Sequence, residues 1–164
     1  MIKLVTLGFA GCDADHKVRE EGGNNRGPRI REYLENTDPP INIAAPWCAA
    51  AVQYWSDAAA RVLGVENPLD AVRLEAYVQS YHDHFAPDGI VTAAEAEPGD
   101  LVLYSFGGQR WDHIGLVAQA PTDSTVWSVE GNTSDANQRD GDVVTIKPRA
   151  LDRSYDVTFI RWGA

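Results

Sequence analysis

The chain has 164 residues, of which 44% are hydrophobic, so it is long enough for one domain with its own core. Its formal net charge of −10 argues against nucleic acid as a partner, because neutralising phosphates requires clustered Lys and Arg. The same charge argues against adsorption to anionic membranes, and no stretch is long and apolar enough to span a bilayer. Two cysteines, Cys12 and Cys48, do not form a disulfide framework, which indicates free thiols made in a reducing cytoplasm.

The first 18 residues are expected to form an N-terminal arm. The apolar run from Ile2 to Phe9 predicts a short strand or extended arm. The letters FAGC before Asp13 faintly resemble a lipoprotein cleavage site, but the apolar run is short for a signal peptide. Asp13, Asp15 and His16 carry side chains that could bind a cation, but without a completing ligand they predict a solvated loop.

Two helices are predicted in the first half of the chain. One begins at Pro28, where the fixed backbone of proline suits the first helical turn. The second runs from Pro46 to Gly64, with apolar residues at roughly i, i+3, i+4 and i+7. Cys48 lies in its first turn, where free N–H groups and the helix dipole favour the thiolate, which is the nucleophilic form. The alternative for a lone cysteine in an apolar helix is a buried structural residue.

The remainder is predicted to contain one weaker helical stretch followed by strands. Pro68 to Phe85 is moderately helical, and we interpret His82 and His84 near its end as structural. Five short runs rich in Val, Ile, Thr and aromatic residues follow and predict strands: DLVLYSF, HIGLVAQA, TVWSVEG, DVVTIKP and VTFIRW. Helices followed by a meander of strands predict an α+β fold, with N-terminal helices packed on a C-terminal antiparallel sheet of about five strands. No linker divides residues 19–164, which we expect to form a single domain.

Polar residues at the ends of two predicted strands could complete a nucleophilic site. His113 begins the second strand, and Glu130 and Asn132 end the third, where residues two apart point to the same face. A Cys–His pair activates the sulfur, while a third polar group fixes the orientation of the imidazole. Glu130 or Asn132 could fill that role, and the other could help to polarise the substrate carbonyl. Taken singly, these residues have simpler interpretations: a half-buried strand histidine, a solvated carboxylate and a turn asparagine. Their joint order after Cys48 favours catalysis.

The sequence resembles the CHAP domains, the cysteine, histidine-dependent amidohydrolases and peptidases of papain-like fold. The stretches that carry the resemblance are EGGNNRGPRIREYL, PWCAAAVQYW, EPGDLVLYS with DHIGLVAQ, VEGNTSD and the final VTFIRW. The resemblance implies that Cys48 is the nucleophile and His113 the general base. It also implies that Glu130 orients the histidine and that Asn132 is an accessory polar residue.

The resemblance implies hydrolysis of an amide bond of the cell-wall peptide, by an endopeptidase or an N-acetylmuramoyl-L-alanine amidase. Bacterial peptidoglycan would be the partner of a monomer, and the protein would be a phage endolysin or related lysin. It would be made in the cytoplasm without a clear signal peptide and act on the wall after release or within a virion. Two alternatives remain. One is a papain-like cysteine hydrolase of another amide, such as a peptide or a glutathionyl–polyamine conjugate. The other is a non-catalytic virion or binding protein.

Two further expectations concern metal and substrate. Some CHAP domains bind calcium through several carboxylates before the nucleophile, but here that stretch offers only Asp38, so we expect no metal and no cofactor. Trp47, Trp55 and Trp111 lie close in sequence to the proposed catalytic residues. We expect them to line the cleft against sugar or peptide, with aromatic core packing as the alternative for each.

Overall fold

The computed structural model describes residues 1–86, 88–134, 141–151 and 155–163. In these ranges, helices α1 (Ile2–Asp15), α2 (Pro28–Glu35), α3 (Cys48–Leu63) and α4 (Val78–Phe85) and a short 3₁₀ turn (Pro68–Ala71) precede nearly all of the sheet. The strands are β1 (Ile90–Val91), β2 (Leu101–Ser105), β3 (His113–Gln119), β4 (Thr125–Thr133), β5 (Val143–Ala150) and β6 (Asp156–Ile160). The predicted α+β class is therefore confirmed.

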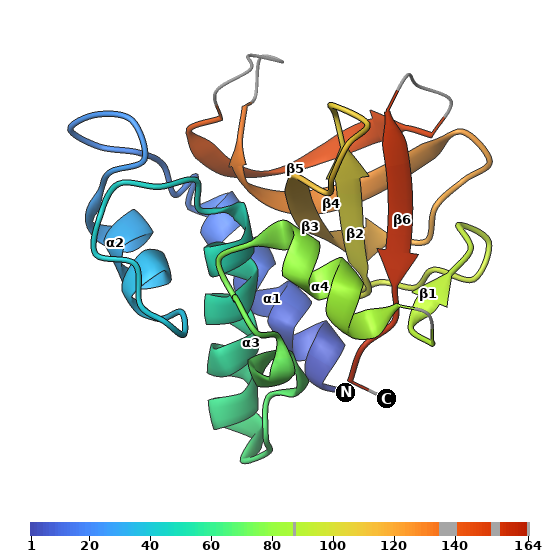
Figure 1. Ribbon diagram of the computed structural model, residues 1–164, viewed down its shortest axis with the longest axis horizontal. Coiled ribbons are helices and arrows are strands. Elements are labelled where there is room, and N and C mark those ends of the chain that lie inside the picture. The colour runs from blue at the N-terminus through green and yellow to red at the C-terminus, as the bar shows by residue number, and fades with distance from the viewer. Residues whose placement is uncertain (87, 135–140, 152–154, 164) are drawn as a thin grey trace.

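The six strands form one antiparallel sheet in the order β1-β6-β2-β3-β4-β5. The five predicted strands correspond to β2–β6, and β1 adds a two-residue edge that pairs with β6. Figure 1 shows α1 and α3 side by side against the sheet. Alternation along the strands divides the core in two. Leu103, Ile114 and Leu116 pack with the helices, whereas Val102 and Val117 pack in a smaller cluster on the opposite face.

The N-terminal segment is a helix, so the prediction of a strand or extended arm over Ile2 to Phe9 is wrong. Ile2, Thr6, Ala10 and Asp13 are its buried residues, and this spacing follows one side of a helix. Ala10 is small enough to allow close packing, and Ile2 and Ala10 belong to the same core as α3. The helix α1 is therefore an integral part of the core.

The other helices follow their sequence signals closely. Proline occupies the start of α2, and Gly64 ends α3 in the left-handed conformation that glycine adopts without strain. Between Pro68 and Phe85, the predicted helix is split into the 3₁₀ turn and the shorter α4. The alanine-rich side of α3 lies within the main core, where small side chains allow the sheet to approach.

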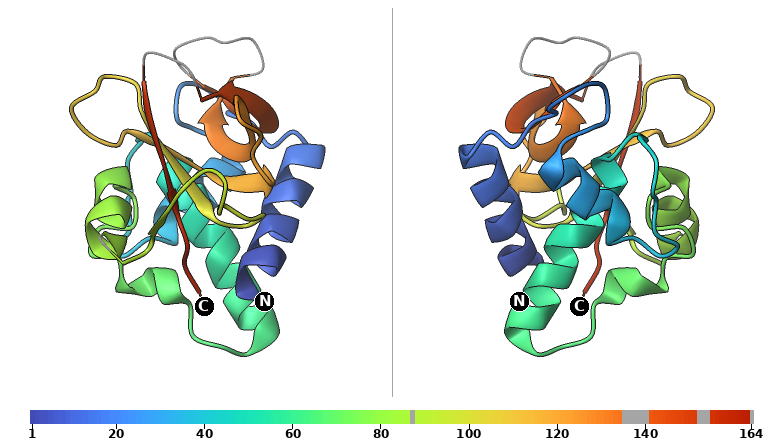
Figure 2. Two further views of the ribbon diagram at one scale, coloured as in Figure 1. Left: turned by 90° about the vertical axis from the view of Figure 1, so that its right-hand side faces the viewer. Right: turned by 90° about the vertical axis from the view of Figure 1, so that its left-hand side faces the viewer.

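The two ends of the described chain meet. A Cβ atom placed on Gly163 would lie 2.8 Å from Cγ2 of Ile2, so the last described residue contacts the first turn of α1. Figures 1 and 2 show the start of α1 and the chain that follows β6 in the lower part of the molecule, whereas α3 begins about half-way up. The chain ends therefore lie away from Cys48, the first residue of α3.

Candidate active site

Cys48 is positioned by contacts between the start of α3 and the end of β4. It is the first residue of the helix and is 5% exposed. The backbone N–H of Trp47 donates to Oδ1 of Asn132 at 3.2 Å. The indole of Trp47 packs directly on Gly131, where a Cβ atom would lie 2.8 Å from the ring. Glycine at position 131 therefore allows the helix start to approach the strand closely.

His113 is positioned by the pairing of β2, β3 and β4. It is the first residue of β3, is buried, and lies opposite Tyr104 on β2. Gly115 lies opposite Glu130 on β4, and a Cβ atom on Gly115 would lie 2.8 Å from Cγ of Glu130. The Glu130 side chain therefore passes over a glycine, and its Oε2 accepts the Nε2 proton of His113 at 2.8 Å.

The hydrogen bond with Glu130 determines which side of the imidazole is available for chemistry. Because Nε2 is engaged, Nδ1 is the ring nitrogen left for the thiol of Cys48. Cys48, His113 and Asn132 line a common pocket of about 230 Å³, together with Asn24, Asn25, Pro46, Phe106, Asp112 and Gly141. The nucleophile candidate and the base candidate therefore face the same space.

The charges around His113 keep it protonated at neutral pH. Burial alone would lower the pKa of His113, but the charge of Glu130 and hydrogen bonds to Cys48 and Glu130 outweigh it and raise this pKa to about 9. Burial alone would raise the pKa of Glu130, yet His113 and Arg149 hold it well below its usual range. The arrangement is therefore an imidazolium beside the sulfur of Cys48, with a fully buried carboxylate behind it.

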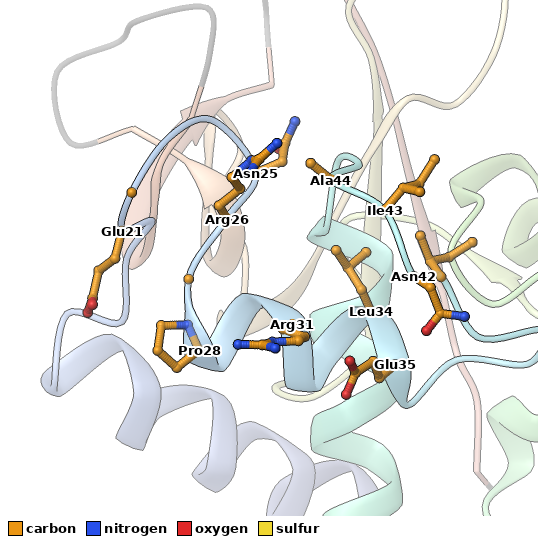
Figure 3. A pocket seen from close by; sticks show the side chains of 13 residues that line it. Glu21, Asn25, Arg26, Pro28, Arg31, Leu34, Glu35, Asn42, Ile43 and Ala44 are labelled. Carbon is orange, nitrogen blue, oxygen red and sulfur yellow. The ribbon is translucent and has the colours of Figure 1, made fainter.

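Two further pockets border this site. One of about 390 Å³ shares Pro46, Cys48 and Asp112 with the cysteine pocket, and most of its other lining residues are apolar. The other, of about 660 Å³, shares Asn25 with the cysteine pocket and is shown in Figure 3. It lies between the loop before α2, α2 itself and the segment that leads to α3, as Figure 3 shows. The apolar pocket therefore adjoins Cys48 directly, and the larger pocket adjoins the cysteine pocket through Asn25.

Comparison of the chain with protein-family models and with curated proteins finds no match.

The four residues predicted to form the catalytic site lie together, but Asn132 differs from its expected arrangement. The pairing of β4 with β5 shifts between Glu130 and Thr133, and Asn132 has a φ of +52°. The expected strand alternation is therefore interrupted. The amide oxygen of Asn132 bonds Trp47, and its nitrogen donates to the carbonyl of Gly141 at 2.7 Å. Of the two candidates for orienting the imidazole, the structure selects Glu130.

Two of the three tryptophans predicted to bind substrate do not reach the cleft. Trp47 and Trp55 are fully buried, so this prediction is wrong for both. Each indole N–H is held internally, by Glu20 for Trp47 and by Asp13 for Trp55. Trp111 lines the apolar pocket beside Cys48, and its contact with substrate remains a prediction.

The prediction of a solvated loop around Asp13 is also wrong. Asp13 is buried and accepts hydrogen bonds from Tyr33 Oη at 2.6 Å, Trp55 Nε1 at 2.8 Å and Arg29 at 3.0 Å. Its oxygens therefore connect α1 to α2 and α3. Within the described ranges, no group of three or more His, Cys, Asp or Glu side chains could hold a metal ion. In the same ranges, no helix combines the length and the apolar character needed to cross a bilayer.

Two polar partners of Glu130 were not identified from the sequence. Ser128 Oγ donates to Glu130 Oε1 at 2.6 Å, and Arg149 donates to both carboxylate oxygens. The sequence contained a signal for Ser128, because residues two apart on a strand point to the same face and Ser128 precedes Glu130 by two residues. The sequence contained no such signal for Arg149, because the strand predicted there ended at Pro148. Since β5 is an edge strand, proline is tolerated there, and the strand continues to Ala150.

Proposed function

We propose that the protein is a cysteine hydrolase that cleaves an amide bond, with Cys48 as nucleophile and His113 as general acid and base. The observation that carries the proposal is the buried hydrogen bond between His113 and Glu130 beside the Cys48 thiol. An imidazole fixed by a carboxylate and facing a thiol at a helix start is the arrangement that nucleophilic catalysis by cysteine requires.

The proposed reaction is acyl transfer in two steps. The Cys48 thiolate attacks the scissile carbonyl, and the carbon–nitrogen bond breaks as His113 donates its proton to the leaving amine. His113 then takes a proton from water, which attacks the thioester and releases the acid and the free thiolate. The backbone N–H of Cys48 lies in the first helical turn, where N–H groups lack intrahelical acceptors, so it can donate to the oxyanion.

We propose the peptide of bacterial peptidoglycan as the substrate, cleaved by an endopeptidase or N-acetylmuramoyl-L-alanine amidase activity of the kind found in phage endolysins. The support is the resemblance to CHAP domains, which covers the residues that meet at the site: Cys48, His113, Glu130 and Asn132. The two pockets that adjoin the cysteine pocket also suit a polymer that continues beyond its scissile bond.

Release of soluble muropeptides from purified sacculi tests this proposal. The wild-type protein should release them, and mass spectrometry of the new amino termini would identify the bond. Cys48→Ala and His113→Ala should each abolish release, and the double variant should lose little more, because the two residues act as one unit. Cys12→Ser is the matched control and should stay within about twofold, since Cys12 is exposed on α1.

The alternatives give different results in the same experiment. A protein whose Cys48 is rapidly alkylated but which releases nothing from several types of sacculi would act on another amide. A protein whose Cys48 is no more reactive than Cys12 would be a non-catalytic binding or virion protein. Undiminished release by His113→Ala would contradict the proposed mechanism.

A further inference from the structure

The Glu130 carboxylate is held by more than its bond with His113. It is fully buried, and its two oxygens accept hydrogen bonds from residues on three strands. Oε2 bonds His113 of β3, while Oε1 accepts from Ser128 of β4 at 2.6 Å and from Arg149 Nε of β5 at 2.9 Å. A second guanidinium nitrogen of Arg149 bonds Oε2. Arg149 therefore contacts the carboxylate at two points.

A two-point contact fixes an orientation that one bond leaves free. The planar guanidinium matches the two oxygens of a carboxylate, so rotation of the Glu130 carboxyl group would break at least one strong bond. In the observed orientation, Oε2 faces the imidazole of His113. A lysine in place of Arg149 would retain the charge but would lack the planar fork.

Arg149 is itself held in place by an aromatic enclosure. Its guanidinium carbon lies 5.1 Å from the ring centre of Tyr104 and 5.0 Å from that of Phe106, within the range of cation–π attraction. Tyr155 packs edge-on against Phe106, with ring centres 5.2 Å apart. The Arg149 side chain is only 16% exposed. Limited exposure strengthens its electrostatic effect on Glu130, because water screens the charges less.

We propose that Arg149 is a positioning residue, which holds the Glu130 carboxylate in the orientation that fixes His113 beside Cys48. The inference rests on the proposed role of Cys48 as nucleophile. In this role Arg149 does not touch the reacting atoms, and it acts on His113 through Glu130.

The expected pH dependence follows from the groups that face Glu130. These are His113 from β3, Tyr104 from β2, Ser128 from β4 and Arg149 from β5, with Cys48 of α3 on the far side of the imidazole. The charge and hydrogen bonds of Arg149 lower the pKa of Glu130. Removing them moves this pKa upward, so Glu130 becomes protonated at a higher pH and stops stabilising the imidazolium.

The test is the rate of Cys48 alkylation by iodoacetamide from about pH 4 to 10, followed on the full chain by peptide mass mapping. In Arg149→Gln, we expect the rate at neutral pH to fall about tenfold and the acid-side midpoint to move to higher pH. Arg149→Lys should lie between this variant and the wild type. Arg161→Gln is the matched control, because Arg161 is also partly buried and pairs with Asp100 rather than Glu130.

The outcomes separate this inference from the proposed function. Equal alkylation of Cys48 and Cys12 in the wild type would refute the nucleophile and the inference together. A reactive wild-type Cys48 with an unchanged profile in Arg149→Gln would refute the inference alone. If Arg149→Gln lacks cooperative thermal unfolding, Arg149→Lys decides, because it keeps the charge and most of the volume. If Cys48 alkylation in Arg149→Lys shows the same pH dependence as in the wild type, the two-point contact is not required and the inference is wrong.

Discussion

The candidate site has a buried carboxylate between two cationic groups. Glu130 bonds His113 on one side and Arg149 on the other, and all three have limited exposure. Removing one member of such a group leaves an uncompensated buried charge, which is strongly destabilising. The carboxylate is therefore important both for the fold and for the protonation state of the imidazole.

The first prediction concerns Glu130→Gln and the pH above which turnover falls. His113 must keep its proton to protonate the leaving amine, so the turnover rate of the wild type should fall as pH rises through about 9. In Glu130→Gln, the charge that raises the pKa of His113 is lost while burial still lowers it. The alkaline midpoint should therefore move to lower pH.

The pH dependence of muropeptide release and NMR titration of the His113 imidazole both measure this shift. Glu66→Gln is a suitable control, because Glu66 is an exposed glutamate beyond the end of α3. An unchanged alkaline midpoint in Glu130→Gln would show that the carboxylate does not determine the protonation of His113.

At the scale of the elements, two glycines determine how closely the parts of the site approach. Gly131 on β4 accommodates the Trp47 ring at the start of α3, and Gly115 on β3 lets the Glu130 side chain pass. Any Cβ atom at either position would lie within 3 Å of a neighbouring atom. The distance between the helix start and the sheet therefore depends on the absence of two side chains.

The second prediction is that Gly131→Ala lowers both the stability of the protein and its turnover. The added methyl group would push Trp47 away, at a cost of about 1–3 kcal/mol in the free energy of unfolding. The resulting displacement of Cys48 from His113 should lower turnover by about 100-fold. Thermal unfolding and muropeptide release measure the two effects.

Gly8→Ala is the matched control for this substitution. Gly8 lies within α1, and a Cβ atom there would meet nothing within 4 Å. Because alanine favours helices more than glycine does, this variant should be more stable by about 0.5–1 kcal/mol and fully active. Normal turnover in Gly131→Ala would contradict a role for close packing at the start of α3.

The helices and strands could be predicted where their residue composition or their apolar periodicity was clear. The strands β2–β6 are short runs rich in Val, Ile, Thr and aromatic residues between turn residues, and α3 combines a single apolar face with helix-terminating Gly64. The helix α1 was not recognised, because apolar residues occur on all its sides and two glycines interrupt it. Arg149 was missed because its contact with Glu130 depends on a strand that continues past Pro148. Such a contact follows from register, which local sequence patterns do not specify.

At the scale of the whole molecule, Asp13 connects three of the helices that share the main core, α1, α2 and α3. It lies near the end of α1 and bonds Arg29 and Tyr33 of α2 and Trp55 of α3. A segment first expected to be a peripheral arm thus supplies the acceptor for two buried donors. The position of α3 therefore depends in part on the N-terminal helix.

The third prediction is that Asp13→Ala loses about 2–4 kcal/mol of stability, because the buried Tyr33 hydroxyl and Trp55 indole N–H lose their acceptor. Chemical denaturation measures this loss. Asp15→Ala provides the control and should stay within about 0.5 kcal/mol, because Asp15 is exposed at the end of the same helix. Equal stability of the two variants would show that the buried carboxylate is dispensable.

The fourth prediction is that muropeptide release survives chelation. The carboxylate of Asp13, the one buried member of the Asp13, Asp15 and His16 cluster, is already occupied by protein donors. Activity after dialysis against EDTA should therefore stay within about twofold of the untreated value. Loss of activity that added calcium restores would reveal a cation site and contradict this expectation.

The contact between Ile2 and Gly163 places the first and last described parts of the chain side by side. A short linker could join the two ends, and the backbone could then be opened at an exposed loop to give a circular permutant with the same core. A module fused at either end would extend from the lower part of the molecule as drawn in Figure 2, away from the start of α3. Both ends therefore lie away from the helix start that carries Cys48.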